Sequence, residues 1–193
     1  ESRYDDPVEG LKFILSPPLR AKEHQEAIWQ GIKDGTLQVI ATDHCSFDFH
    51  GDKQNGKDDF TKCPNGAPGV ETRMPIVFSE GVSKGRLSLN EFAAVTSTNP
   101  AKIFGMYPKK GVLAPGSDAD IVLMNPDMEV TITKNILHEN VDYTPYEGIQ
   151  VKGWPVMTMV RGQAVVENER LQVPLGFGRY INRKPVKYTE LLK

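Results

Sequence analysis

The chain has 193 residues, of which 39% are hydrophobic, enough to bury the core of roughly one to one and a half domains. Its 23 basic and 25 acidic side chains give a formal net charge of −2, which excludes a strong electrostatic surface for nucleic acid or an anionic membrane. No apolar run approaches the roughly 18 residues of a membrane span. This charge balance favours a small neutral substrate or a protein partner. Cys45 and Cys63 form no C-x-x-C pair, so we expect a protein of the reducing cytoplasm.

A helix and a strand are the first elements that the pattern predicts. Between Ala21 and Asp34 apolar residues recur at helical spacing, and Gly35 suits the left-handed position beyond a helix end. The run Leu37–Ala41 is short, apolar and bounded by polar residues, which favours a buried strand. A helix followed so closely by a buried strand predicts a parallel α/β layer.

A long polar loop and further helices follow. Residues 48–68 are rich in Gly, Lys, Asp, Asn and Pro, and a loop of this length just after a strand favours a functional segment. A helix is predicted from Val70 to Lys84. Another helix is predicted to begin at Ser88, whose spacing to Glu91 is that of a capping box. A helical stretch restarts at Asn99-Pro100 and ends at Gly105.

The pattern changes after Tyr107, where turn residues alternate with short runs rich in Val and Thr, which is typical of an antiparallel sheet. We therefore predict a boundary near Lys109. Residues 1–108 would form a helical α/β part, and residues 109–172 a small β part. Residues 173–193 would be an extended tail that is loose or packs on a partner.

Asp43 is the first candidate for chemistry because it directly follows the predicted strand 37–41. Parallel α/β barrels carry their active sites at the carboxyl ends of strands, where a carboxylate can bind a metal ion or move a proton. The same side chain could instead cap a helix or accept bonds from backbone amides, and local spacing favours neither interpretation. His44 would point to the opposite side of the strand and is interpreted as a supporting or packing residue.

Two further residues could hold a polar ligand. The segment Cys63–Glu71 contains two glycines and two prolines around Asn65, and Ser16 follows a short apolar run. Ring amides present alternating N–H and C=O groups, which backbone groups, an amide or a hydroxyl can match. Local sequence alone nevertheless favours an ordinary turn at Asn65 and an ordinary strand-end hydroxyl at Ser16.

Several motifs in order resemble the dihydropyrimidinase and D-hydantoinase family of the amidohydrolase superfamily. They are L-S-P-P-L-R from Leu15, A-T-D-H-C-S-F from Ala41, D-F-T-K from Asp59, P-N-G from Pro64 with G-V-E from Gly69, and G-S-D-A-D-I-V from Gly116. The resemblance extends over nearly the whole chain. Its most discriminating part is the T-D-H-C-S-F stretch followed by P-N-G.

The resemblance implies an α/β fold, the C-terminal part of a (β/α)8 TIM-type metallo-hydrolase barrel plus part of a small β-sandwich. It implies two zinc ions per complete protomer, bridged by a carboxylated lysine, with Asp43 as a metal ligand that also shuttles the proton. Ser16 and Asn65 would hold the amide edge of the substrate, largely through backbone groups. A tetramer of identical subunits and a place in pyrimidine degradation are further implications.

Most of the family's metal site has no counterpart in this sequence. Its H-x-H pair, bridging lysine, later metal-binding histidines and pocket tyrosine match no segment of the 193 residues. One carboxylate does not hold a catalytic zinc ion, which normally takes three or more protein ligands. We therefore expect this chain to carry only part of the active site and to hydrolyse nothing unaided.

The expected reaction is hydrolysis of the cyclic amide C–N bond of a dihydropyrimidine or a 5-substituted hydantoin. Collapsin response mediator proteins offer an alternative, a non-catalytic role in assembly, but that resemblance would replace the aspartate and the P-N-G amide, and both Asp43 and Asn65 are present. Dihydroorotases carry a histidine where this chain has Phe47, which suits a substrate without a carboxylate at that point.

Overall fold

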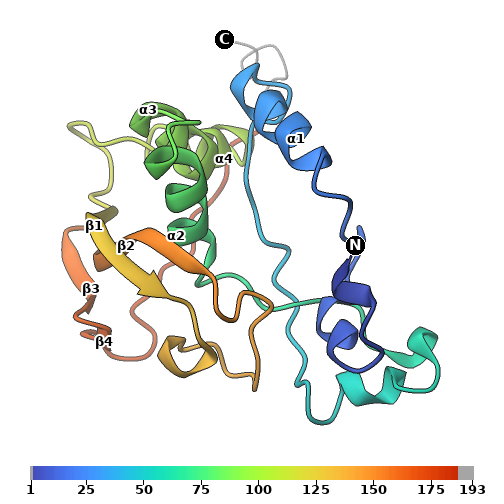
Figure 1. Cartoon of the computed structure of the whole chain (residues 1–193). Coiled ribbons are helices and arrows are strands. Elements are labelled where there is room, and N and C mark those ends of the chain that lie inside the picture. The colour runs from blue at the N-terminus through green and yellow to red at the C-terminus, as the bar shows by residue number, and fades with distance from the viewer. Residues whose placement is uncertain (1, 187–193) are drawn as a thin grey trace.

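A computed structural model describes residues 2–186 and shows a four-stranded sheet, a helical layer against it and a looser N-terminal part (Figure 1). The α-helices are α1 (His24–Lys33), α2 (Arg73–Val77), α3 (Leu89–Ala93) and α4 (Asn99–Ile103). Wider π-helical turns, Phe78–Ser83 and Ala94–Thr98, continue α2 and join α3 to α4. The described residues contain five 3₁₀ turns, at Ser2–Tyr4, Glu9–Phe13, Lys53–Gly56, Phe60–Lys62 and Lys134–Ile136.

The sheet is antiparallel throughout, in the order β1 (Ile121–Thr131), β2 (Gln150–Val160), β3 (Gln163–Glu167) and β4 (Arg170–Leu171). Arg161 and Gly162, both with positive φ, form the tight turn between β2 and β3 that such hairpins favour. The β1–β2 register shifts between Asn125 and Glu129, where Pro126 has no N–H to give to the ladder. The antiparallel sheet predicted after Tyr107 is confirmed.

Helix ends follow the predicted signals. Gly35 and Gly85 have φ values of 80° and 70° directly after the predicted helical stretches. Ser88 and Glu91 form the predicted capping box, in which each side chain bonds the other residue's backbone N–H. Among the described residues, no helix is long and apolar enough to cross a membrane.

Residues 37–41 form no strand within residues 2–186, so that prediction is wrong for the described part of the chain, while the parallel layer stays a prediction. Leu37 is 42% exposed, and residues 37–41 have no ladder partner in the described part of the chain. The helical layer instead holds this extended segment through single bonds. Ile40 N donates to Val95 O at 3.1 Å, Arg73 Nη1 donates to Ile40 O at 2.8 Å, and Asn99 Nδ2 donates to Gln38 O at 2.8 Å.

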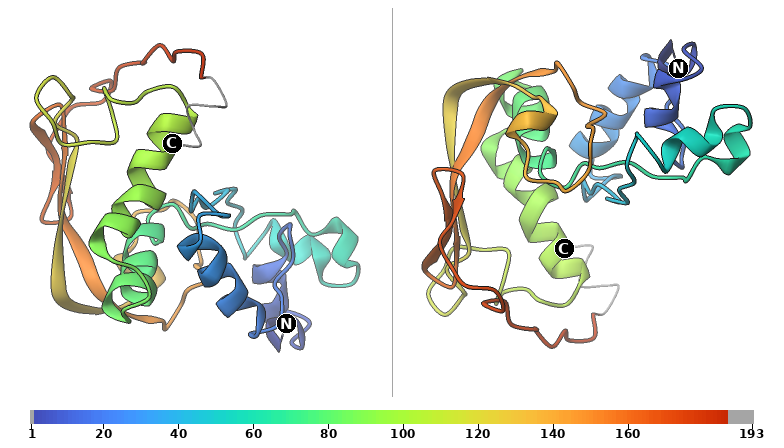
Figure 2. Two further views of the ribbon diagram at one scale, coloured as in Figure 1. Left: turned by 90° about the horizontal axis from the view of Figure 1, so that it is seen from above. Right: turned by 90° about the horizontal axis from the view of Figure 1, so that it is seen from below.

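The elements stack in the order sheet, helices α2–α4, then α1 with the N-terminal turns, as both views in Figure 2 show. Apolar contacts join the layers in three small clusters of buried side chains. The first contains Val77, Phe78 and Phe92; the second Ile132, Leu137, Val151 and Trp154; the third Leu11, Phe49, Cys63 and Tyr143. The third cluster places Tyr143, from the C-terminal half, among residues of the first 63.

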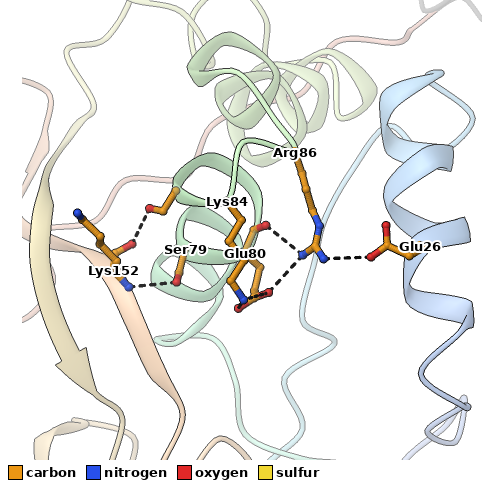
Figure 3. A network of polar contacts seen from close by, with 7 residues as sticks. Glu26, Ser79, Glu80, Lys84, Arg86 and Lys152 are labelled. Carbon is orange, nitrogen blue, oxygen red and sulfur yellow. Dashed lines mark hydrogen bonds and ion pairs between the residues drawn. The ribbon is translucent and has the colours of Figure 1, made fainter.

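A polar network also joins the layers (Figure 3). Ser79 Oγ accepts from Lys152 N on β2, and Ser83 Oγ donates to Lys152 O, each at 3.0 Å. Arg86 pairs with Glu80 at 3.3 Å in the helical layer and with Glu26 of α1 at 3.0 Å. These contacts connect the sheet, the helical layer and α1.

Gly153 on β2 provides a test of how closely the helical layer approaches the sheet. It has a φ of 101°, and a Cβ there would collide with the ring of Phe78. Gly116 has a similar φ of 91° but nothing within 4 Å of its Cβ position, so it is a matched control for backbone strain alone. We expect Gly153→Ala to lower the free energy of unfolding by about 1–3 kcal/mol more than Gly116→Ala.

Urea unfolding of both variants and the unmodified protein, each including any upstream part, measures this difference. Equal losses for the two variants would contradict the close packing of Phe78 on β2.

Candidate functional site

A cavity of about 660 Å³ lies where three connecting segments of the described residues meet. Residues predicted to carry function line it together: Ser16, Asp43 and Asn65. The remaining lining residues are Arg3, Phe13, Leu15, Pro17, Leu19, Ala41, Thr42, Cys45, Gly66, Ala67, Pro68, Pro145, Tyr146 and Ile149. A wall that is mostly apolar with a few polar groups is typical of a small-molecule site.

Backbone hydrogen bonds hold the three segments together. Gly66 N donates to Ile14 O at 3.0 Å, and Cys45 N donates to Ala67 O at 3.3 Å. Gly66 passes so close to Cys45 that a Cβ at residue 66 would meet the Cys45 carbonyl oxygen and lie 2.9 Å from its Cβ. A glycine is therefore needed here. These bonds place Ser16, Asp43 and Asn65 around one space, although the first and the last lie 49 positions apart in the sequence.

Asp43 has a φ of 48°, which is uncommon for a residue other than glycine and is often found at functional sites. Its side chain is exposed and accepts no hydrogen bond from any described residue. It therefore performs none of the capping or turn-stabilising roles that local sequence left open. The carboxylate is available to a ligand in the cavity.

His44 is turned away from this space. Its Nδ1 accepts from Gly69 N at 3.1 Å and from Val70 N at 3.3 Å. Glu139 Oε1 lies 3.7 Å from the same nitrogen and accepts from Glu71 N at 3.1 Å. His44 therefore holds the backbone that follows Pro68 in place and does not itself line the cavity.

Tyr146 is a site residue that sequence reasoning missed. It lines the cavity from the loop between β1 and β2, and Gly69 packs on its ring. Burial, followed by the nearby Glu139 carboxylate, raises the pKa of Tyr146, so its hydroxyl keeps its proton at neutral pH. A single tyrosine in a loop signals nothing locally, and only the folding of residues 134–149 back onto the N-terminal part brings it here.

A metal ion would need more ligands than this part of the chain provides. Within residues 2–186, no three His, Cys, Asp or Glu side chains are grouped so that they could hold one. Asp43 could contribute one carboxylate, but alone it does not fit a zinc centre, which takes three or more protein ligands.

The sequence model of the Amidohydrolase family matches residues 9–165. The chain is 48% identical over 184 residues to a D-hydantoinase of Geobacillus stearothermophilus, covering 95% of this chain and 39% of that protein. It is 46% identical over 185 residues to a D-phenylhydantoinase of Escherichia coli O1:K1, covering 96% and 40%. The chain thus spans about two fifths of the length of these relatives.

Solved structures also resemble the chain over about two fifths of their own length. A dihydropyrimidinase from Brevibacillus agri NCHU1002 superposes with a TM-score of 0.94 at 49% identity, covering 96% of this chain and 41% of that one. An L-hydantoinase (dihydropyrimidinase) from Arthrobacter aurescens superposes with a TM-score of 0.82 at 37% identity, covering 93% and 40%.

The two cysteines provide a test of the cavity wall. Cys45 is exposed at the cavity, whereas Cys63 is buried, and burial raises the pKa of its thiol, which lowers its thiolate fraction. We expect iodoacetamide to alkylate Cys45 and to leave Cys63 largely unmodified in the folded protein, as read by peptide mass spectrometry. Equal labelling without unfolding would contradict the packing of residues 48–68, and urea-unfolded protein provides the control in which both react.

Proposed function

The chain belongs to the amidohydrolase family, and we propose that it is the part of a cyclic-amide hydrolase that supplies one wall of the active site. The substrate would be a dihydropyrimidine or a 5-substituted hydantoin, and the bond broken would be a ring C–N bond. The observation that carries this proposal is the convergence of Ser16, Asp43 and Asn65 on one cavity. The relatives that bear hydantoinase and dihydropyrimidinase names support it.

Ser16 and Asn65 would bind the ring. A cyclic amide presents neighbouring C=O and N–H groups, and a site that recognises it needs a donor beside an acceptor. Ser16 and Asn65 both line the cavity, and their backbone groups would supply most of these donors and acceptors, since no described residue accepts from the Asn65 N–H. The apolar side chains of Phe13, Leu15 and Leu19 would take up the ring face.

Asp43 would move the proton. Hydrolysis adds water across the ring bond: the water oxygen bonds to the carbonyl carbon, the C–N bond breaks, and the leaving nitrogen gains a proton. A carboxylate between the attacking water and that nitrogen can accept the proton from one and deliver it to the other. Asp43 is the only carboxylate among the residues that line the cavity of the described structure.

Zinc is proposed as the metal of the complete protein, with Asp43 as one ligand and the other ligands outside this chain. Because the described residues do not form a metal site, the chain alone should hold no stoichiometric zinc and should hydrolyse no ring. Metal analysis and assay of the isolated chain test both statements.

We further propose that residues 1–108 are the C-terminal part of a TIM-type barrel and that residues 109–172 are strands of a small β-sandwich. Residues 173–193 would form a tail that contacts another subunit of a homotetramer. Leu175, 96% exposed, supports a contact made by the tail, while residues 187–193 lie outside the described residues. A role in pyrimidine degradation in the cytoplasm fits such a substrate.

The presence of both Asp43 and Asn65 argues against the alternative of a non-catalytic assembly protein. Such a protein would not need an unpaired carboxylate held at positive φ beside a cavity.

The role of Asp43 is tested by Asp43→Asn in the complete protein. We expect the kcat for dihydrouracil or hydantoin to fall by roughly 10²–10⁴-fold, because the amide cannot carry the proton. Asp48→Asn is the matched control, since Asp48 is an exposed carboxylate on the same segment that does not line the cavity. Unchanged turnover in Asp43→Asn would exclude Asp43 as the proton carrier, and an unmodified protein that opens neither ring would contradict the proposed reaction.

A further inference from the structure

Lys53 is a fully buried lysine in a loop of otherwise polar, surface-forming composition. Its exposed fraction is 0%, and its ammonium donates to Ile14 O at 2.9 Å and to Pro64 O at 2.7 Å. Within the described residues no carboxylate forms an ion pair with it. The charge is costly in this position, because burial disfavours the cation and lowers the pKa of Lys53.

Its two partners belong to the two segments that carry the proposed ring-binding residues. Ile14 lies just before Ser16, and Pro64 directly precedes Asn65. Ile14 O also accepts from Gly66 N at 3.0 Å, so the backbone and Lys53 join the same two segments at neighbouring points. Removing the ammonium would leave Ile14 O with the bond from Gly66 N alone, and Pro64 O with only the weak thiol donor of Cys63 at 3.7 Å.

The bond to Pro64 O has a direct consequence for Asn65. The Pro64 carbonyl and the Asn65 N–H belong to one peptide group, and a charge-assisted bond to the oxygen polarises the N–H at the other end. Among residues 2–186, no acceptor bonds the Asn65 N–H, and Asn65 lines the cavity. This N–H is therefore free to donate to a ligand.

We propose that Lys53 is a positioning residue for ring binding, which holds the Asn65 peptide in place and strengthens its N–H as a donor to a carbonyl of the substrate ring. The proposal rests on the proposed function. Lys53 itself does not line the cavity, so it acts through the Asn65 peptide and touches no reacting atom.

Steady-state kinetics of the complete protein test the effect on substrate. Lys53→Met removes the charge and the hydrogen-bond donors but keeps a side chain of similar length. Lys53→Arg keeps a cation with donors at this position. Lys57→Met is the control, because Lys57 is an exposed lysine of the same loop. We expect Lys53→Met to raise KM roughly tenfold, the loss of about one hydrogen bond, with a smaller change in kcat. Lys53→Arg should recover most of the loss, and Lys57→Met should match the unmodified protein.

Hydrogen–deuterium exchange of the same proteins tests positioning without relying on activity. Lys53→Met should speed exchange in residues 13–16 and 64–67, while α2–α4 and the sheet stay unchanged. Faster exchange throughout, with kcat and KM altered together, would mean that Lys53 serves stability alone and would overturn the proposal. So would unchanged exchange in those two segments.

If the unmodified protein opens no cyclic amide, the proposed function fails. The exchange measurement then still decides whether Lys53 fixes the Asn65 segment. Failure of Lys53→Arg to recover KM, while its exchange is normal, would contradict the effect on the Asn65 donor.

Discussion

The hydrogen bond from Gly66 N to Ile14 O joins two loops directly, beside the bridge that the Lys53 ammonium makes between Ile14 O and Pro64 O, and the site depends on these contacts. In a sheet, many ladder hydrogen bonds align the neighbouring strands, whereas here single contacts align the extended segments. Gly66 makes the approach possible because any side chain would strike Cys45. The shape of the cavity therefore depends on the positions of a few backbone groups rather than on a series of strand-to-strand hydrogen bonds.

The C-terminal half completes this arrangement. The loop between β1 and β2 returns to the N-terminal part, where Asp142 accepts from Phe49 N at 2.6 Å and from His50 N at 2.8 Å. Tyr143 enters the cluster around Leu11, and Tyr146 closes one side of the cavity. The sheet is thus both a unit packed on helices α2–α4 and the anchor of a loop that shapes the site (Figure 2).

Local signals predicted those features of the fold that depend on local chemistry. Glycines after α1 and the π turn, the Ser88–Glu91 capping box and the alternating runs after Tyr107 each act within a few residues, so sequence suffices to identify them. The strand at 37–41 could not be judged in this way. An apolar run forms a strand only where a neighbour supplies ladder bonds, and none of the described residues does so for Leu37–Ala41.

Similar limits apply to the site. The position of Asp43 after an apolar run predicted a functional carboxylate. Ser16 and Asn65 were favoured as ligand-binding residues only through the family resemblance. All three residues line one cavity. Lys53 and Tyr146 could not be predicted, because a lone lysine among Gly, Asp and Asn indicates a surface loop and burial is decided by distant segments.

The most direct measurement is a crystal structure of the complete protein, with Asp43→Asn to slow turnover, soaked with a 5-substituted hydantoin. We expect the ring in the cavity, with a ring carbonyl near the Asn65 N–H, its amide edge at Ser16 and the scissile bond beside residue 43. A ring bound elsewhere, or bound here without contact to Ser16 or Asn65, would contradict it.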